Sequence, residues 1–301
     1  MAMAVLTVVM KNYSTTFLPI ILFSLMVLLS PVIANSSPFN ITIGSSLSTS
    51  SAENSYWLSP NGTFAFGFYQ LPSTASADQY IVGIWIPKSS SKTLVWVANR
   101  DDPPFSAPSS ILFTQYGNLV QVSGTKEIPL LSSVQSPASY AMFLDNGNLV
   151  LYNSYSHIVW ESFDFPTDTI LPGQTLKSGF SVVAKNSPSD YSTGRYSLKG
   201  EKLGAVKVYD DKDFHHHRLV RMEMKLNSDG RLYLVGWNGL TVTNLTKGEE
   251  HNETMAGNRV VYRATMDYDG AFSLYEEKLG FQMENSGCGT TSDCPEKCSL
   301  A

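Results

Sequence analysis

Acidic side chains gather in one short stretch of this sequence at a spacing that could support hydrolysis. Glu161, Asp164 and Asp168 place three carboxylates close together along the chain, and paired carboxylates are the groups that cleave glycosidic bonds. The same acids also suit the turns of a connecting segment, where they accept hydrogen bonds from backbone N–H groups. No other hydrolase motif accompanies them, so we favour the turn-capping interpretation and expect no catalytic residue.

A run of three histidines offers the residue type that binds transition metals. In an extended strand the side chain of His216 points away from those of His215 and His217, so only two imidazoles could share an ion. Asp211 or Asp213 could add a carboxylate. We favour an exposed loop here and expect neither a metal site nor a cofactor, and the sequence also has no P-loop, kinase or G-x-S-x-G motif.

The stretch FLDNGNLVLY places a turn signal directly before a strand signal. Its central Asn-Gly pair tolerates the positive φ of hairpin turns, and the residues that follow have the β-branched and aromatic character of a strand. Alternation along that strand turns its two leucines to one face and Asn148, Val150 and Tyr152 to the other. The polar groups of the outward face could hold a ligand.

The composition is that of an extracellular protein. Only 16% of the 301 residues are charged, against about 25% in typical soluble domains, and Ser, Thr and Asn are abundant. The formal net charge is −5, so the chain lacks the basic field that binds a phosphate backbone. We therefore expect no nucleic-acid partner.

The amino terminus predicts secretion. Lys11 precedes an apolar run from Phe17 to Ala34, and small residues stand at the end of that run, which is the pattern of a signal peptide spanning residues 1–34. The alternative is an uncleaved anchor helix, because the run approaches the ~20 residues that span a bilayer. With cleavage after Ala34, we expect no membrane span in the mature chain.

Glycosylation motifs agree with an extracellular location. Five N-x-S/T triplets without a central proline predict glycosylated asparagines, at Asn35, Asn40, Asn61, Asn244 and Asn252. Five such motifs behind a signal peptide carry more weight than one alone.

The cysteines are confined to the carboxyl-terminal end. Cys288, Cys294 and Cys298 are the only ones in the sequence, so the middle of the chain must fold without disulfides. An odd number of cysteines indicates a truncated disulfide-rich module in residues 283–301, with a pairing that spacing does not define. A zinc site would need a fourth ligand that the sequence does not show.

A short motif recurs along the chain and predicts the fold. Each copy has a glycine followed by a strand with apolar residues at alternate positions, at Gly62, Gly117, Gly147, Gly204, Gly230 and Gly270. Short strands at turn-punctuated intervals argue for an all-β protein. Three copies on each side of a gap predict two domains of three hairpin-built sheets, over residues 40–165 and 166–282.

The core and the loops follow from the same pattern. Residues 98–110 are rich in small and polar types and predict a loop. Four tryptophans lie in apolar strands and are expected to fill the first core: Trp57, Trp85, Trp96 and Trp160.

Three long motifs resemble a known family. TLVWVANRDDPP, LDNGNLVLY and WESFDFPTDTILPGQTL resemble the bulb-type lectin domains in the ectodomains of plant G-type (S-domain) receptor-like serine/threonine kinases. The resemblance covers about residues 40–280 and implies tandem β-prism II lectin domains. It also implies that an EGF-like module, a membrane helix and a kinase domain would follow, so the end of this chain would be a truncation, an alternative transcript or a gene-model artefact. The expected location is the apoplast, or the plasma membrane if a longer form exists.

The same resemblance implies a mannose site on the third sheet. In the related lectins each sheet presents a Q-x-D-x-N-x-V-x-Y face. Asn148, Val150 and Tyr152 match it, whereas Leu144 replaces the glutamine and Asn146 the aspartate. Each lost or weakened hydrogen bond costs ~0.5–1.5 kcal/mol, so mannose should bind roughly ten- to a hundredfold more weakly than at an intact face.

Three functional interpretations follow. The first is a secreted module that binds a mannose-type glycan or a glycoprotein weakly. The second is a protein-interaction module, such as a receptor ectodomain dimer, whose sugar sites have decayed. The third is a fragment of a full-length receptor kinase, since no motif in this chain transfers phosphate.

Overall fold

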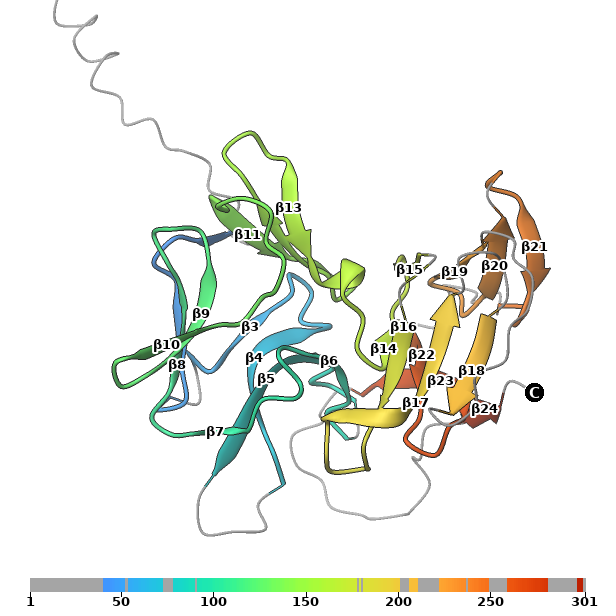
Figure 1. Cartoon of the computed structure of the whole chain (residues 1–301), viewed down its shortest axis with the longest axis horizontal. Coiled ribbons are helices and arrows are strands. Elements are labelled where there is room, and N and C mark those ends of the chain that lie inside the picture. Colours follow the sequence, from blue (N-terminus) through green and yellow to red (C-terminus); the bar gives the residue numbers. More distant parts are fainter. Residues whose placement is uncertain are drawn as a thin grey trace, which may run out of the picture. The chain divides into compact units, whose positions relative to one another are not determined.

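The predicted repeat forms a succession of antiparallel hairpins (Figure 1). The computed structural model describes residues 40–51, 54–72, 78–89, 91–177, 179, 181–200, 206–210, 222–236, 238–248, 259–280 and 297–299. Nearly all of their regular structure is β-strand, and η2 (Ser162–Asp164) is a short 3₁₀ turn. The all-β class is confirmed. In these ranges no helix is long and apolar enough to cross a membrane.

Three antiparallel sheets build the first half of the described chain. The third sheet, which carries the FLDNGNLVLY hairpin, has the order β1 (Asn40–Thr42), β11 (Tyr140–Phe143), β12 (Leu149–Tyr152), β13 (Ile158–Glu161). The second sheet has the order β10 (Lys126–Pro129), β9 (Leu119–Ser123), β8 (Ser110–Phe113), β2 (Ser46–Ser48). The first sheet has the order β3 (Tyr56–Leu58), β4 (Ala65–Gln70), β5 (Gln79–Trp85), β6 (Leu94–Val97), and β7 (Phe105–Ser106) pairs with β5.

The three sheets share one hydrophobic core. Phe66 from the first sheet, Phe113 from the second and Leu149 and Leu151 from the third are fully buried in one cluster. Strand alternation explains this, because it turns every second side chain of each hairpin to the same face.

The tryptophans follow the prediction in part. Trp96 and Trp160 are buried in the core, and Trp57 is partly buried against it. Trp85 is buried outside this cluster, where its ring meets those of Tyr56 and Tyr69 edge to face. A buried tryptophan in an apolar strand therefore does not always mark the central core.

Three further sheets build the second half. One has the order β14 (Thr169–Ile170), β22 (Arg259–Met266), β23 (Phe272–Leu279), β24 (Lys297–Ser299). Another has the order β15 (Thr175–Leu176), β19 (Met222–Leu226), β20 (Leu232–Gly236), β21 (Thr241–Asn244). The last has the order β16 (Ser181–Lys185), β17 (Thr193–Gly200), β18 (Val206–Asp210).

A second buried cluster fills this half, and it includes Ile170, Met224, Leu232 and Ala264. The two clusters alternate along the chain rather than changing at one point, because Ile170 belongs to the second cluster whereas Leu171 and Leu279 belong to the first, and the described residues all belong to one compact unit. The domain boundary near residue 166 stays a prediction. The expected signal peptide, the histidine run, Cys288 and Cys294 lie outside the described residues.

Candidate functional site

The third-sheet hairpin carries the predicted site. β11 and β12 pair in register, with Met142 opposite Val150. The turn between them is closed by the N–H of Leu144, which donates to the carbonyl oxygen of Asn148 (2.9 Å), and Gly147 takes the positive φ of 85° that the turn requires. The turn predicted from the Asn-Gly pair is therefore present.

Asn148 lies inside the protein, with 5% of its surface exposed. Its Nδ2 donates to Glu161 Oε2 (2.7 Å), and its Oδ1 accepts from Ser162 Oγ (3.0 Å) and from the N–H of Phe163 (3.2 Å). The chain that leaves β13 folds over this asparagine in turn η2. This corrects the expectation of an outward amide, because internal partners already use most of its hydrogen-bonding capacity.

Val150 is also covered, with only 1% of its surface exposed. Its neighbours across the sheet, Met142 on β11 and Glu161 on β13, stand directly opposite it and share its face. The expected open apolar surface for a sugar ring is therefore absent at this residue.

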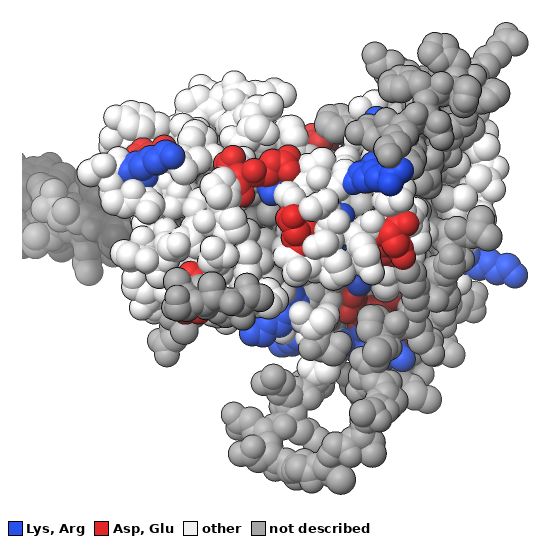
Figure 2. Space-filling view, turned by 60° about the horizontal axis from the view of Figure 1, so that its bottom comes forward, with Lys and Arg blue, Asp and Glu red and all other residues white. Residues whose placement is uncertain are grey.

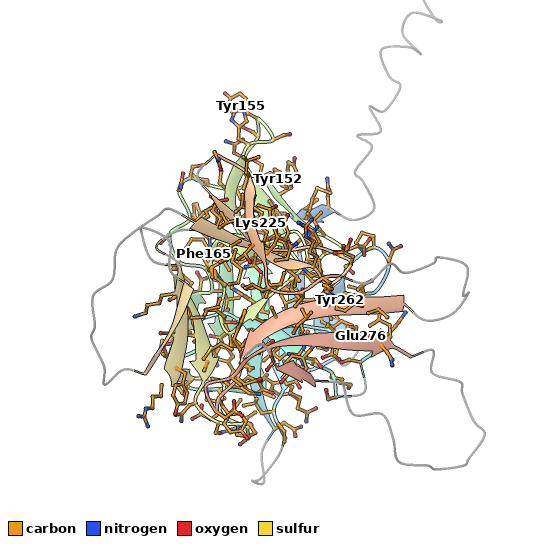
Figure 3. The ribbon with its side chains drawn as sticks, turned by 90° about the vertical axis from the view of Figure 1, so that its right-hand side faces the viewer. Tyr152, Tyr155, Phe165, Lys225, Tyr262 and Glu276 are labelled. Atoms are coloured by element: carbon orange, nitrogen blue, oxygen red, sulfur yellow. The ribbon has the colours of Figure 1, made fainter. Side chains whose placement is uncertain are left out.

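Tyr152 and Asn146 keep part of their surface in solvent. The ring of Tyr152 stacks on that of Tyr140, with centroids 5.0 Å apart, and partial burial raises the pKa of the Tyr152 hydroxyl. Asn146 Oδ1 accepts from the N–H of Asn148 (3.1 Å). Figure 3 shows Tyr155 at the tip of the next hairpin, beyond Tyr152, and its side chain is exposed. The predicted face thus offers a ligand Asn146, Tyr152 and the partly exposed Glu161.

The other two copies of the motif differ from the third. Asn118 in the second sheet is exposed, and its side chain makes no hydrogen bond to a described residue. In the first sheet Asn61 is tied to the third-sheet turn, because Asp145 accepts from its N–H and its Nδ2, both at 2.8 Å. Asp145 therefore joins two hairpin turns that are 84 residues apart in sequence.

The three acids of the connector go to separate partners. Glu161 accepts from Asn148, Asp164 forms an ion pair with Lys177, and Asp168 accepts from Thr169 Oγ1. Each carboxylate thus has a polar partner of its own, as the turn-capping interpretation expects.

Arg100 fastens the first half of the chain to the second. Its guanidinium donates to the carbonyl oxygens of Val183 (2.8 Å), Ala184 (3.2 Å), Tyr191 (2.9 Å) and Ser192 (3.2 Å). Burial lowers its pKa, and the nearby carboxylates oppose that shift. The sequence predicted only a loop for residues 98–110.

Asp101 continues the same contact. Its two carboxylate oxygens accept from the N–H (2.7 Å) and the Oγ1 (2.8 Å) of Thr193, and these bonds lower its pKa. The one sequence signal for the contact is the group Arg-Asp-Asp within an otherwise charge-poor chain.

A buried ion pair stands beside this junction. Arg263 donates to Glu277 Oε1 (2.8 Å), and Thr93 from the first half donates to the same oxygen (3.2 Å). Asp168 is buried nearby, and desolvation raises its pKa against the opposing charges of Arg100 and other cations. On the face shown in Figure 2, the described charges form small groups of both signs.

The predicted glycosylation sites that fall in the described ranges lie at different depths. Asn61 and Asn244 are exposed, whereas Asn40 in β1 is half-buried and its Oδ1 has no hydrogen-bond partner. Asn35 and Asn252 lie outside the described residues. Among the described side chains, no group of three His, Cys, Asp or Glu is arranged to hold a metal ion.

Comparison with known proteins identifies a lectin domain. The family model of the D-mannose binding lectin matches residues 93–188, a segment that contains the second and third hairpins and Arg100.

Plant receptor kinases match over most of the chain. The G-type lectin S-receptor-like serine/threonine-protein kinase LECRK4 of Oryza sativa subsp. indica is 33% identical over 283 residues, which cover 85% of this chain and 33% of that protein. LECRK1 of Oryza sativa subsp. japonica is 34% identical over 273 residues, covering 83% and 32%. This chain thus spans about a third of the length of these relatives.

Two solved lectins also align with the structure. The mannose-specific agglutinin of snowdrop (Galanthus nivalis) bulbs covers 41% of this chain and 99% of its own, with 16% identity and a TM-score of 0.26. The fetuin-binding agglutinin of Scilla campanulata, a two-domain lectin, covers 78% and 98%, with 14% identity and a TM-score of 0.30.

Proposed function

Because this chain carries a bulb-type lectin domain and is homologous over most of its length to plant G-type lectin S-receptor-like kinases, we propose that it is an extracellular module that binds a glycan or a glycoprotein. The observation that carries the proposal is the match of residues 93–188 to the D-mannose binding lectin family. The proposal assigns recognition to this chain and no catalytic step.

Mannose itself should bind weakly at the third-sheet face. Asn146 and Tyr152 remain accessible, but Asn148 is bonded internally and Val150 is covered. A ligand there would reach two of the four predicted contact residues, and each missing neutral hydrogen bond costs ~0.5–1.5 kcal/mol. Binding in the millimolar range is the expected result.

Glycan-array binding followed by calorimetry tests the function. The full chain is secreted from plant cells and titrated with methyl α-D-mannoside and with the best array ligand. Failure to bind any glycan or glycoprotein on the array would overturn the proposed function. The variant Tyr152→Ala tests the face, with Tyr116→Ala as its control, because Tyr116 is an exposed tyrosine on the second-sheet turn.

Secretion and glycosylation belong to the same proposal. A glycan on exposed Asn61 would leave one hydrogen on Nδ2, so the bond to Asp145 could persist. Amino-terminal sequencing should find residue 35 first, and enzymatic deglycosylation should lower the mass. An intact, unmodified protein inside the cell would contradict both expectations.

A second candidate function is association of two copies through strand β21. This strand is the edge of its sheet, and Leu240 directly before it and Val242 within it are 67% and 54% exposed. An exposed apolar edge can pair with the same edge of another chain. Sedimentation equilibrium would show a dimer that Val242→Lys dissociates, and a monomer at all concentrations would exclude this candidate.

A further inference from the structure

A pocket of about 400 Å³ opens where the three sheets of the first half meet. β6 of the first sheet, the segment that follows β10 of the second and β13 of the third each contribute to its wall. Its volume falls within the ~300–1,000 Å³ range of small-molecule sites. The residues of the predicted mannose face do not line it.

The floor of the pocket is apolar and fixed. The ring of Trp96 meets that of Trp160 edge to face at 6.0 Å, and Trp160 stacks on Phe165 at 5.5 Å. Both indole N–H groups are already used, because Trp96 donates to the carbonyl oxygen of Phe165 (2.8 Å) and Trp160 to that of Ser132 (3.0 Å). Leu131 completes the floor. A ligand therefore meets hydrocarbon there and no free donor.

The rim carries acceptors that have no partner. Asn99 donates from Nδ2 to the carbonyl oxygen of Pro129 (2.8 Å), which leaves its Oδ1 free. No described residue donates to the carboxylate of Asp102, which is exposed at the rim. Arg100 and Asp101 also line the pocket, but their charged groups are engaged by residues 183–193. The rim therefore offers oxygen acceptors and no unengaged cation among the described residues.

We propose that this pocket binds a neutral sugar residue of the glycan. The hydroxyl groups of the sugar donate to Asp102 and to Asn99 Oδ1, and the C–H face of its ring lies on the floor formed by Leu131 and Phe165. Donation to an ionised carboxylate gives a strong hydrogen bond. Uronic acids are disfavoured, because their carboxylate would face Asp102 without a free cation. This inference rests on the proposed glycan-binding function and assigns it a site away from the third-sheet face.

The test uses the secreted full chain and saturation-transfer NMR with methyl α-D-mannoside, methyl β-D-glucoside and D-glucuronate, with affinities from calorimetry. Asp102→Ala should weaken the tighter neutral sugar about tenfold, the loss expected for a hydrogen bond to a charged acceptor. Its matched control is Asp78→Ala, a carboxylate outside the pocket wall that accepts from Gln70. Because the Asp102 carboxylate makes no hydrogen bond or ion pair with a described residue and is exposed, its removal should leave the unfolding transition unchanged.

The outcomes separate the pocket from the function. Loss of binding in Asp102→Ala with binding retained in Asp78→Ala and Tyr152→Ala supports the pocket. Loss in Tyr152→Ala with full binding in Asp102→Ala overturns the pocket and leaves the proposed function standing. Binding of D-glucuronate as tightly as the neutral sugars also overturns it. If the wild-type chain binds none of the neutral probes yet binds an array glycan, the pocket proposal is wrong and the function holds.

Discussion

The second-sheet and third-sheet hairpins share the sequence Gly-Asn-Leu-Val but use its asparagine in opposite ways. Asn118 is exposed and its side chain is unbonded among the described residues, whereas Asn148 is buried and makes three hydrogen bonds. In both, the following leucine enters the core. The partners of Asn148 lie 13 to 15 residues further along the chain. The motif thus predicts the hairpin, while a more distant segment decides what the asparagine does.

The glycines of the two turns, Gly117 and Gly147, also differ, and here the turn of the second sheet is the more constrained. A Cβ on Gly117 would lie 2.2 Å from the carbonyl oxygen and 2.3 Å from the nitrogen of Ala138, which is backbone. A Cβ on Gly147 would meet Leu171 Cδ1 at 2.6 Å, a side-chain atom that can move. The second turn therefore depends on its glycine, and the third depends more on its asparagine.

Gly117→Ala should have the largest effect on stability. The substitution combines the strain of φ 73° with a backbone overlap, and we expect a loss of more than ~3 kcal/mol or failure to fold. Gly147→Ala should cost less, about 1–2 kcal/mol, because Leu171 can shift. Denaturant unfolding of both variants measures the difference, and equal losses would break the contrast between the two turns.

Asn148→Ala should have the next largest effect, a loss of about 2–4 kcal/mol in the free energy of unfolding. The change leaves Ser162 Oγ and the N–H of Phe163 without their acceptor in a largely buried place. Asn118→Ala is the matched control and should change stability by less than ~0.5 kcal/mol. Chemical unfolding of the secreted chain gives both values. A small loss in Asn148→Ala would mean that its internal hydrogen bonds are dispensable for stability.

Glu161→Gln should lower the free energy of unfolding less than Asn148→Ala does. Glutamine keeps an oxygen that can accept from Asn148 but removes the charge, so we expect a loss of about 0.5–1.5 kcal/mol. Glu127→Gln in strand β10 of the second sheet is the control, because Glu127 is exposed and makes no side-chain hydrogen bond to a described residue. The same thermal or chemical melts measure both variants. A loss in Glu127→Gln as large as in Glu161→Gln would argue against a specific role of the Asn148–Glu161 bond.

The fold was predictable where its determinants are local. Gly62, Gly117, Gly147, Gly230 and Gly270 each precede a strand, as the repeat predicted, and all take positive φ, whereas Gly204 lies outside the described residues. A turn residue and an alternating strand lie next to each other in sequence, so the pattern alone is sufficient.

The site was less predictable, because its determinants are distant. The covering of Val150 depends on which strands stand beside β12, and the role of Arg100 depends on carbonyl groups 83 to 92 residues away. Single-sequence patterns carry no information on such pairings. The group Arg-Asp-Asp in residues 100–102 was the available signal, since a charged group in a charge-poor chain often has a specific partner.

The smallest predicted effect concerns the segment that follows the third hairpin. This segment carries Asp168, whose pKa burial raises although Arg100, Lys185 and Arg263 oppose the shift. When the folded pKa lies above the unfolded value, the native state binds more protons between the two values, so stability falls as pH rises through that window. Asp168→Asn cannot titrate and lacks this fall. From about pH 4, near the ordinary pKa of aspartate, to pH 7, the variant should therefore gain stability relative to wild type.

Asp101→Asn is the matched control for this pH effect, because hydrogen bonds from Thr193 lower the pKa of Asp101. The native state then binds fewer protons than the unfolded state below about pH 4, so wild type gains stability as pH rises through that lower window. The Asp101→Asn variant lacks this gain, so its stability relative to wild type should fall as pH rises through that window. This trend is opposite to the one expected for Asp168→Asn. Urea unfolding midpoints of the three proteins between pH 3 and pH 8 measure both trends. Parallel curves for all three would mean that neither carboxylate changes its pKa on folding, and that the third hairpin's connector contributes no charge-dependent stability.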